Sequence, residues 1–415
     1  MLLNAIKTSV ELARKIGSPL GLFFISLLLV AGCSESEQTA ARPASATADE
    51  QPKATAPAPV PQMLPNWYAT AMERHQPLGK VEGDLRPLPA PAQNAVGFDA
   101  VIDYAAQQQS YSLLIWHDGA LVLEHYFEPY DAELRPESAS MHKSVLGLVV
   151  AAAIDDGFIA SVDDGVGKYL AEWSDDPRGD ITLRQLLTMS SGLKPLSREG
   201  GEQSAAFRYL FEGREARQAT LNLSLEQTPG ELFYYQDTNP QVLVLALEQA
   251  TGMPYQQYLS QRLWQRIGAD DAYVWMNEPE RFPRGNTALM AKARDWLKVG
   301  LLIKDGGIYQ GDQVISSAMM AEATAASSAN PNYGWLIWRG AEYEPVRYYN
   351  ALKQGAGFAV SAPFKADDML YFDGFGGQRV FISRDKDLVI VRLGAMHFDW
   401  DDAILPNLVI DALEQ

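Results

Sequence analysis

Cysteine and histidine are scarce in this 415-residue sequence, and each scarcity argues against a class of site. The single cysteine, Cys33, has no partner for a disulfide within the chain. The five histidines show neither the His-x-His nor the His-Glu-x-x-His spacing that is typical of metal hydrolases. The sequence also has no Gly-x-Ser-x-Gly elbow and no glycine-rich nucleotide loop. We therefore expect no metal and no cofactor.

Basic residues are also few. The 34 lysines and arginines are outnumbered by 52 aspartates and glutamates, which gives a net charge of -18 and a pI near 4.7. Such a chain repels phosphate backbones and anionic lipid surfaces, so we expect no nucleic-acid partner. The length alone allows one large domain or two ordinary ones.

The apolar run near the N-terminus is too short to cross a bilayer. It covers residues 22–30, whereas a membrane-spanning helix needs roughly 20 apolar residues. It follows several basic residues and ends in Ala31-Gly32-Cys33, which predicts a secretory signal over residues 1–33. The end of this segment resembles a bacterial lipobox, and the resemblance implies lipidation of Cys33. The alternative is an ordinary signal peptide with an incidental cysteine.

The next segment, residues 34–62, is rich in Ala, Pro, Thr, Ser, Glu and Gln. Such a composition cannot bury enough apolar surface to fold, so we expect a disordered tether. Ser34 follows the cysteine where an aspartate would mark retention in the inner membrane. The resemblance to lipoproteins therefore implies a place in the bacterial cell envelope. The lipid anchor would lie in the outer membrane, and the folded body, residues 63–415, would face the periplasm.

A Ser-x-x-Lys pattern at Ser140 and Lys143 is the main candidate for chemistry. Residues three apart share one face of a helix, so the two side chains can form a hydrogen bond. A lysine whose pKa is lowered can activate a serine nucleophile. His142 projects from a different face, and we interpret it as a neighbour of the site rather than a general base. The same spacing recurs twice without a long apolar run after it: Ser191 with Lys194, and Ser383 with Lys386.

Apolar periodicity and turn residues predict helices and strands on both sides of this motif. The Asp118-Gly119 pair predicts a hairpin between the first two strands. Thr182 is expected to cap a short helix that Gly192 ends. The expected helices are 98–107, 145–154 and 401–413, and the expected strands are 112–116, 120–127, 333–338, 370–372, 379–382 and 388–393.

In this order the segments resemble the serine beta-lactamase and penicillin-binding-protein superfamily. The similarity is to its class C-like branch, which includes esterases, D-amino-acid peptidases and 6-aminohexanoate-dimer hydrolases. It runs from about Tyr111 to about Leu393. Besides Ser-x-x-Lys, it rests on residues 229–235, 243–252, 291–303 and 374–378. It implies an α+β fold, in which an antiparallel sheet flanked by helices carries a large all-helical insertion at about 145–325 and the active site lies between them.

The resemblance also implies that Tyr235 belongs to a second motif, Tyr235-Gln236-Asp237. A phenol beside Lys143 and the serine oxygen can relay a proton to the leaving group. The alternative is a buried aromatic residue without a chemical role. Asp237 departs from the usual Asn or Ser, and an ionised carboxylate cannot donate a hydrogen bond to a substrate carbonyl. Asp237 could instead hold Lys143 charged or orient it.

The third motif is expected at Gly374, Gly376, Gly377 and Gln378. Glycines let a substrate lie against the backbone, and an N–H of this segment with that of Ser140 could form an oxyanion hole. A structural turn would use the same glycines. The Lys of the usual Lys-Thr-Gly motif is missing. Because that cation recognises a substrate carboxylate in relatives, its absence favours an ester or a neutral amide.

The sequence therefore predicts a serine hydrolase that acts on a small ester or amide through a seryl acyl-enzyme. One alternative is a beta-lactamase or a D-amino-acid peptidase with peptidoglycan-like substrates. The alternative from another class is a non-catalytic cell-wall-binding lipoprotein, although such a protein would be expected to have lost Ser140, Lys143 or Tyr235. Residues 197–227 are expected to border the cleft, and aromatic residues within 341–366 could shape substrate choice.

Overall fold

The computed structural model describes residues 78–91, 97–196, 203–209, 216–277, 281–355, 357–396 and 399–415. The predicted signal segment with Cys33 and the predicted tether lie outside these residues. Within the described ranges, no helix is long and apolar enough to cross a bilayer.

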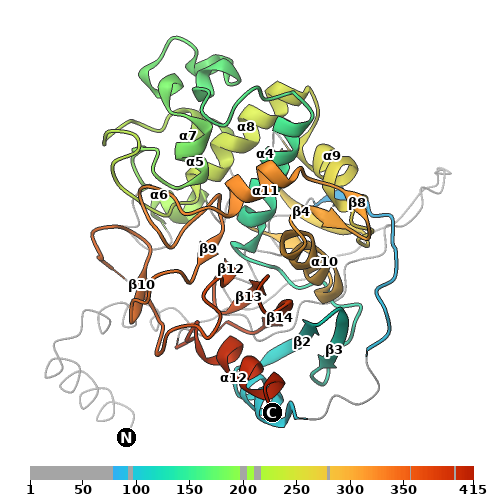
Figure 1. The fold of residues 1–415 in the computed structure, drawn as a ribbon. Helices are drawn as coiled ribbons and strands as arrows, with labels where there is room; N and C mark the ends of the chain where they lie inside the picture. The colour runs from blue at the N-terminus through green and yellow to red at the C-terminus, as the bar shows by residue number, and fades with distance from the viewer. Residues whose placement is uncertain are drawn as a thin grey trace, which may run out of the picture. The chain divides into compact units, whose positions relative to one another are not determined.

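A six-stranded antiparallel sheet forms the centre of the fold, with the strand order β3-β2-β14-β13-β12-β9 (Figure 1). The early strand β2 lies between its hairpin partner β3 and the last strand, β14, so that Leu113 lies opposite Arg392. This arrangement confirms the predicted antiparallel sheet built from both ends of the chain. The strands are β2 Ser110–His117, β3 Ala120–Tyr126, β9 Trp338–Arg339, β12 Leu370–Gly374, β13 Gln378–Ser383 and β14 Leu388–Gly394.

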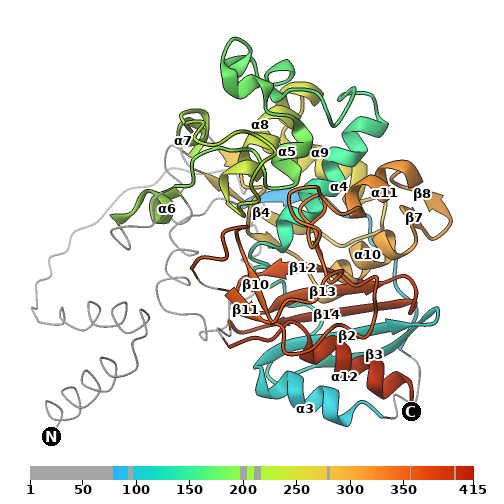
Figure 2. The same cartoon turned by 60° about the vertical axis from the view of Figure 1, so that its left-hand side comes forward.

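Helices cover both faces of this sheet. Helix α10 (Ala293–Lys304) packs on β13 and β14, while α3 (Asp99–Gln107) packs on β2 and on α12 (Ile404–Leu413) at the opposite side (Figure 2). Gly300 allows the close approach of α10, because a Cβ there would lie 2.5 Å from Val389 Cγ1. Because both faces are covered, every residue of β13 and β14 is buried, and the apolar runs 380–382 and 388–391 are continuous rather than alternating.

The hairpin between β2 and β3 turns at the predicted Asp-Gly pair. Asp118 and Gly119 have φ values of +48° and +76°, and residues of this kind adopt left-handed backbone at little cost. The prediction of a hairpin at this point is confirmed.

The helical part of the molecule surrounds α4 (Met141–Asp155). Residues 141–153 of this helix are all buried, as expected for a helix that is apolar around its whole circumference. The other helices described in this part are α5 Leu183–Leu187, α6 Ala205–Phe207, α7 Ala216–Leu221, α8 Thr238–Thr251, α9 Tyr255–Leu259 and α11 Ser317–Thr324. Short 3-10 or π turns are η2 Val166–Lys168, η3 Ala171–Trp173, η4 Pro177–Asp180 and η7 Ser260–Trp264.

The predicted insertion at 145–325 is not wholly helical. β4 (Ala272–Asn277) pairs with β1 (Leu78–Val81), β5 (Phe282–Pro283) and β6 (Leu289–Met290). The partner strand β1 lies at the very start of the described body, far from β4 in the sequence, so no local pattern predicts this small sheet. Two further strand pairs are β7 Ile308–Tyr309 with β8 Asp312–Gln313, and β10 Val346–Tyr348 with β11 Gly357–Ala359.

Several predicted element boundaries were wrong, among them the helix expected at 145–154, which begins at Met141. The strand expected at 333–338 is reduced to β9, because Leu336 has a φ of +57° and interrupts the extended chain. The helix capped by Thr182 ends at Leu187, and Met189 with a φ of +55° turns the chain before Gly192 is reached. The last helix begins at Ile404 rather than at residue 401.

Candidate active site

Ser140 and Lys143 lie at the start of the buried helix α4. Ser140 is the residue before the helix and is partly exposed, whereas the Lys143 side chain is 1% exposed. Lys143 Nζ lies 2.7 Å from Ser140 Oγ, so the predicted hydrogen bond is present. Ala139 directly before the serine has a φ of +49°, a strained conformation for a residue with a Cβ. Such strain is common where a fold fixes a reactive side chain.

Lys143 Nζ has two other acceptors besides the serine. Asp237 Oδ1 lies 2.8 Å away and the backbone carbonyl of Asn286 lies 2.7 Å away. Three acceptors match the three N–H groups of an ammonium, whereas a neutral amine has only two. As an ammonium, Lys143 donates to all three oxygens, and Asp237 is its ion-pair partner. Asp237 thus lies where it can orient Lys143, which is one of the two roles expected of it.

Tyr235 faces the same pair. Lys143 Nζ lies 5.0 Å from the centre of the Tyr235 ring, and the phenol forms a side-chain hydrogen bond with Ser140. Desolvation by the surrounding protein, together with the negative charges of Asp373 and Asp237, raises the pKa of Tyr235 well above its ordinary value. The side chain is therefore a neutral phenol, which can accept one proton while it donates another.

The Tyr235 ring belongs to an aromatic cluster. It stacks on Trp338 at 5.8 Å between ring centres and contacts Tyr349 at 5.0 Å and Tyr333 at 6.2 Å. Its backbone N–H donates to the carbonyl of Tyr349 at 2.8 Å. Tyr235 can therefore be both a packed aromatic residue and a proton relay, because the packed ring fixes the position of the phenol oxygen.

His142 has a structural environment. Its Nδ1 lies 2.8 Å from the Thr287 carbonyl and its Nε2 lies 2.9 Å from the Tyr255 hydroxyl. A carbonyl only accepts, so Nδ1 carries the proton and Nε2 accepts from Tyr255. Complete burial lowers the pKa of His142 to about 4, and the nearby Lys143 adds to this effect. Both ring nitrogens are engaged, in agreement with its interpretation as a neighbour of the site.

Gly374 lies against the start of α4. A Cβ on this residue would be 2.5 Å from the Ser138 carbonyl oxygen and 3.0 Å from Met141 Cγ, so only glycine fits here. The last residue of β12 is therefore next to the segment that carries Ser140, as the predicted third motif requires. Its part in an oxyanion hole remains a prediction.

The next residues of the predicted third motif, Gly376, Gly377 and Gln378, form a turn and hydrogen bonds within the sheet. Gly376 and Gly377 have φ values of +77° and +90° and form the turn between β12 and β13. The Gln378 amide donates to the Gly394 carbonyl at 2.6 Å and accepts from the Gly394 N–H at 2.9 Å. Both ends of this side chain are thus bound within the sheet, and the substrate role expected of these three residues remains a prediction.

Two groups at the site were not predicted. The Asn286 carbonyl binds Lys143, but a backbone oxygen carries no residue-specific signal in a sequence. Asp373 precedes Gly374 and accepts a 2.7 Å hydrogen bond from the Tyr349 hydroxyl. Its place in the apolar run of β12 could have been noticed as a buried charge, but its partners are distant in sequence.

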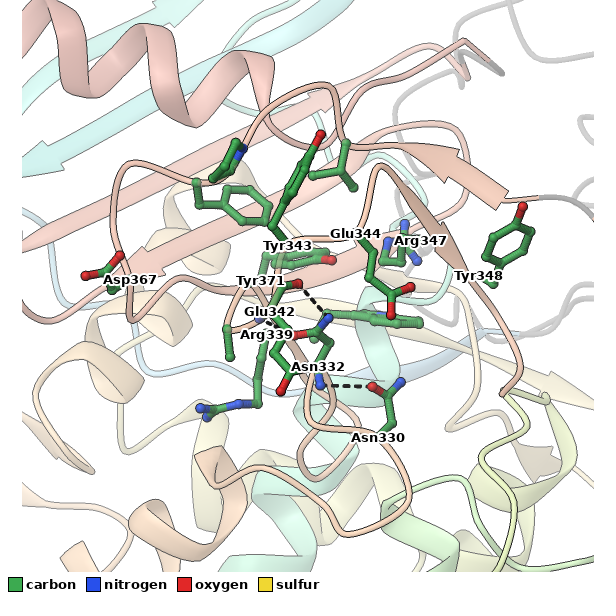
Figure 3. Close-up of a pocket in the computed structure, with 16 residues that line it drawn as sticks. Asn330, Asn332, Arg339, Glu342, Tyr343, Glu344, Arg347, Tyr348, Asp367 and Tyr371 are labelled. Atoms are coloured by element: carbon green, nitrogen blue, oxygen red, sulfur yellow. Dashed lines mark hydrogen bonds between the residues drawn. The ribbon is translucent and has the colours of Figure 1, made fainter. Parts of the chain in front are cut away.

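A pocket of about 140 Å³ lies beside the aromatic cluster and is lined by Trp338, Arg347 and Tyr371 among others (Figure 3). Tyr343 and Tyr348, two of the aromatic residues within 341–366, also line it. Their influence on substrate choice remains a prediction. Among the described residues, no cluster of three or more His, Cys, Asp and Glu side chains could hold a metal ion.

Comparisons with known proteins agree with this architecture. One relative is the 6-aminohexanoate-dimer hydrolase of Paenarthrobacter ureafaciens, which is 27% identical over 227 residues. The match covers 52% of this chain and 57% of that relative, so the chain spans little more than half of the relative's length.

Two solved structures show a similar fold. A Bacillus anthracis protein, provisionally named a 6-aminohexanoate-dimer hydrolase, gives a TM-score of 0.65 at 18% identity and covers 83% of this chain and 90% of its own. A penicillin-binding protein from Bacillus halodurans gives a TM-score of 0.56 at 15% identity, over 76% of this chain and 99% of its own. The family model described as Beta-lactamase matches residues 98–407, which is more than half of the sequence, and the chain therefore belongs to the Beta-lactamase family.

Proposed function

We propose that this chain is a serine hydrolase that cleaves a neutral carboxylic ester or amide through an acyl-enzyme on Ser140. The observation that carries the proposal is the 2.7 Å contact between Lys143 Nζ and Ser140 Oγ at the start of a buried helix. Membership of the Beta-lactamase family and the named hydrolase relative support it.

The contacts of Lys143 suggest how the serine reacts. An ammonium that donates to Ser140 Oγ stabilises the negative charge that develops on this oxygen during attack. The Ser140 proton passes to the Tyr235 oxygen while the Tyr235 proton passes to the leaving group, so the phenol is neutral before and after the step. Water then attacks the acyl-enzyme by the reverse relay and releases the acid.

The charges around the site favour a neutral substrate. Arg347 and Arg379 lie against β12, but both guanidinium groups are ion-paired with Asp373 and Asp402. Beta-lactams and D-amino-acid peptides carry a carboxylate that a free cation would recognise. We therefore place them second, as the alternative substrates. The name of the relative, a 6-aminohexanoate-dimer hydrolase, leads us to include small amides among the substrates.

We further propose that Cys33 is lipidated and that residues 34–62 tether the hydrolase to the outer membrane of a bacterial cell, facing the periplasm. The support is the lipobox-like sequence alone. Incorporation of labelled palmitate into the wild-type chain expressed in bacteria, and its loss in Cys33→Ser, would support the anchor. Equal incorporation in both would contradict it.

The function is tested by intact-mass measurement after incubation with a fluorophosphonate, and separately with a penicillin. We expect a fluorophosphonate adduct on the wild-type chain and none on Ser140→Ala. Ser383→Ala is the matched control, because Ser383 has the same Ser-x-x-Lys spacing, and it should keep the adduct. A stable penicillin adduct would favour the peptidoglycan-like substrates. No adduct with either probe would favour the non-catalytic binder.

A further inference from the structure

Four charged side chains behind the site form a buried ion cluster, which consists of Arg347, Asp373, Arg379 and Asp402. Arg347 binds Asp402 Oδ2 at 2.7 Å and Asp373 Oδ2 at 3.1 Å. Arg379 binds Asp402 Oδ1 at 2.7 Å and Asp373 Oδ1 at 2.8 Å. Each guanidinium thus bridges both carboxylates, and the four charges cancel.

The burial of this cluster is not explained by a gain in the stability of the fold. All four side chains are 6% exposed or less. The desolvation of buried ions offsets much of their attraction, so such pairs are weak stabilisers of a fold. They do impose a fixed geometry on the elements that carry them. Here those elements are β10, β12, β13 and the segment before α12.

One connection leads from the cluster to Tyr235. The Tyr349 hydroxyl donates to Asp373 Oδ2 at 2.7 Å, and the Tyr349 carbonyl accepts from the Tyr235 N–H at 2.8 Å. The two tyrosine rings are 5.0 Å apart. The Arg347 guanidinium also lies 4.4 Å from the centre of the Trp338 ring, which stacks on Tyr235. The Arg347 guanidinium lies 5.8 Å from the centre of the Tyr371 ring, and both residues line the pocket (Figure 3).

A second connection leads to the start of α4. Asp373 immediately precedes Gly374, whose Cα lies against the Ser138 carbonyl. Arg379 Nη1 donates to the Gly374 carbonyl at 2.8 Å and to the Gln378 carbonyl at 2.9 Å. The cluster therefore fixes both the end of β12 and the tyrosine, on either side of Ser140.

We propose that Asp373 is a positioning residue that sets the Tyr235 phenol against Ser140 through Tyr349 and holds Gly374 beside the start of α4. This inference rests on the proposed function of Ser140. Asp373 touches no reacting atom itself, so its effect is on the rate of the reaction at Ser140.

The first test removes only the hydroxyl of Tyr349. In Tyr349→Phe the ring remains while the link to Asp373 is lost, and the rate constant for fluorophosphonate labelling of Ser140 should fall roughly 10-fold or more, because small displacements of reacting groups cost large factors in rate. Tyr258→Phe is the matched control, because it loses a similar 2.7 Å phenol–carboxylate bond, to Asp156 at the far end of α4. Its labelling rate should stay within a factor of two of wild type.

The second test uses Asp373→Asn and the pH dependence of labelling. The charged and titratable groups that face Tyr235 are Lys143, Asp237, Tyr333, Arg347, Tyr349 and Asp373. Asp373 is one of the charges that raise the pKa of the Tyr235 phenol, so the alkaline limb that Tyr235→Phe abolishes should begin at a lower pH in Asp373→Asn than in wild type. A residue with a purely structural role would lower the rate without moving this limb.

The outcomes separate the two proposals. If the wild-type chain is not labelled on Ser140, the proposed function fails and this inference fails with it. If the wild-type chain is labelled but Tyr349→Phe reacts as fast as Tyr258→Phe, only the positioning role is overturned. Tyr349→Phe keeps the buried ions intact, so it decides the question even if Asp373→Asn does not fold. A fall in rate with an unmoved limb in Asp373→Asn would also overturn the inference.

Discussion

The buried imidazole of His142 makes the stability of the fold depend on pH in a way that one substitution can isolate. Its pKa is about 4 in the folded chain, against an ordinary value of 6.5, and burial is the main cause. The unfolded chain therefore binds a proton on this ring between these two values, and the folded chain does not. Titration of His142 therefore leaves the free energy of unfolding unchanged above pH 6.5 and lowers it progressively as the pH falls toward 4.

The size of the effect follows from the difference between the two pKa values. Each unit corresponds to about 1.4 kcal/mol, so the full loss is roughly 3 kcal/mol, of which about 2 kcal/mol is reached near pH 5. His142→Gln removes the titrating group. It also loses one of two hydrogen bonds, which should cost about 1–2 kcal/mol at every pH.

Urea unfolding near pH 7 and near pH 5 measures both effects. The carboxylates are common to both proteins, so the difference between them isolates His142. Wild type should lose about 2 kcal/mol more than His142→Gln between the two conditions. His125→Gln, at a partly exposed ring on β3, controls for the loss of an imidazole. An equal loss in wild type and His142→Gln would refute the description of His142 as a buried neutral ring.

Three substitutions test the geometry around Ser140. Tyr235→Phe removes the relay oxygen, so kcat on a p-nitrophenyl ester should fall about 100-fold or more with little change in KM; a kcat close to wild type would contradict the relay. Asp237→Asn removes the ion-pair partner of Lys143, and kcat in the same assay should fall roughly 10-fold; unchanged turnover would show that the pairing is incidental. Gly374→Ala places a Cβ 2.5 Å from the Ser138 carbonyl, so fluorophosphonate labelling should slow and the melting temperature should drop; no change in either would mean that the end of β12 is not held against α4.

The sequence predicted those features that depend on local spacing. Ser140 and Lys143 share a helical face whatever surrounds them, and Asp118-Gly119 selects a hairpin by its own backbone preference. The apolar runs of β13 and β14 predicted strands because both of their faces are buried. The order of these segments was enough to predict the family and the antiparallel sheet.

The remaining features depend on contacts between distant residues. β1 and β4 are separated by most of the helical part, so their pairing has no local signal. The role of Asp237 was left open because it departs from the usual Asn or Ser, and its contact with Lys143, 94 positions away, depends on the fold. Gln378 was placed in the third motif by the family resemblance, and nothing in the sequence indicated that both ends of its amide bind Gly394. Residue type alone could not distinguish a group that faces the substrate from one that supports the strand.

The most direct test of the central claim is to capture the acyl-enzyme. The chain would be quenched in acid during turnover of a p-nitrophenyl ester and mapped by peptide mass spectrometry, with Ser140→Ala assayed in parallel. We predict an acyl group on the peptide that contains Ser140 and loss of turnover in the variant. An acyl group on another residue, or turnover by Ser140→Ala at the wild-type rate, would contradict the proposed chemistry.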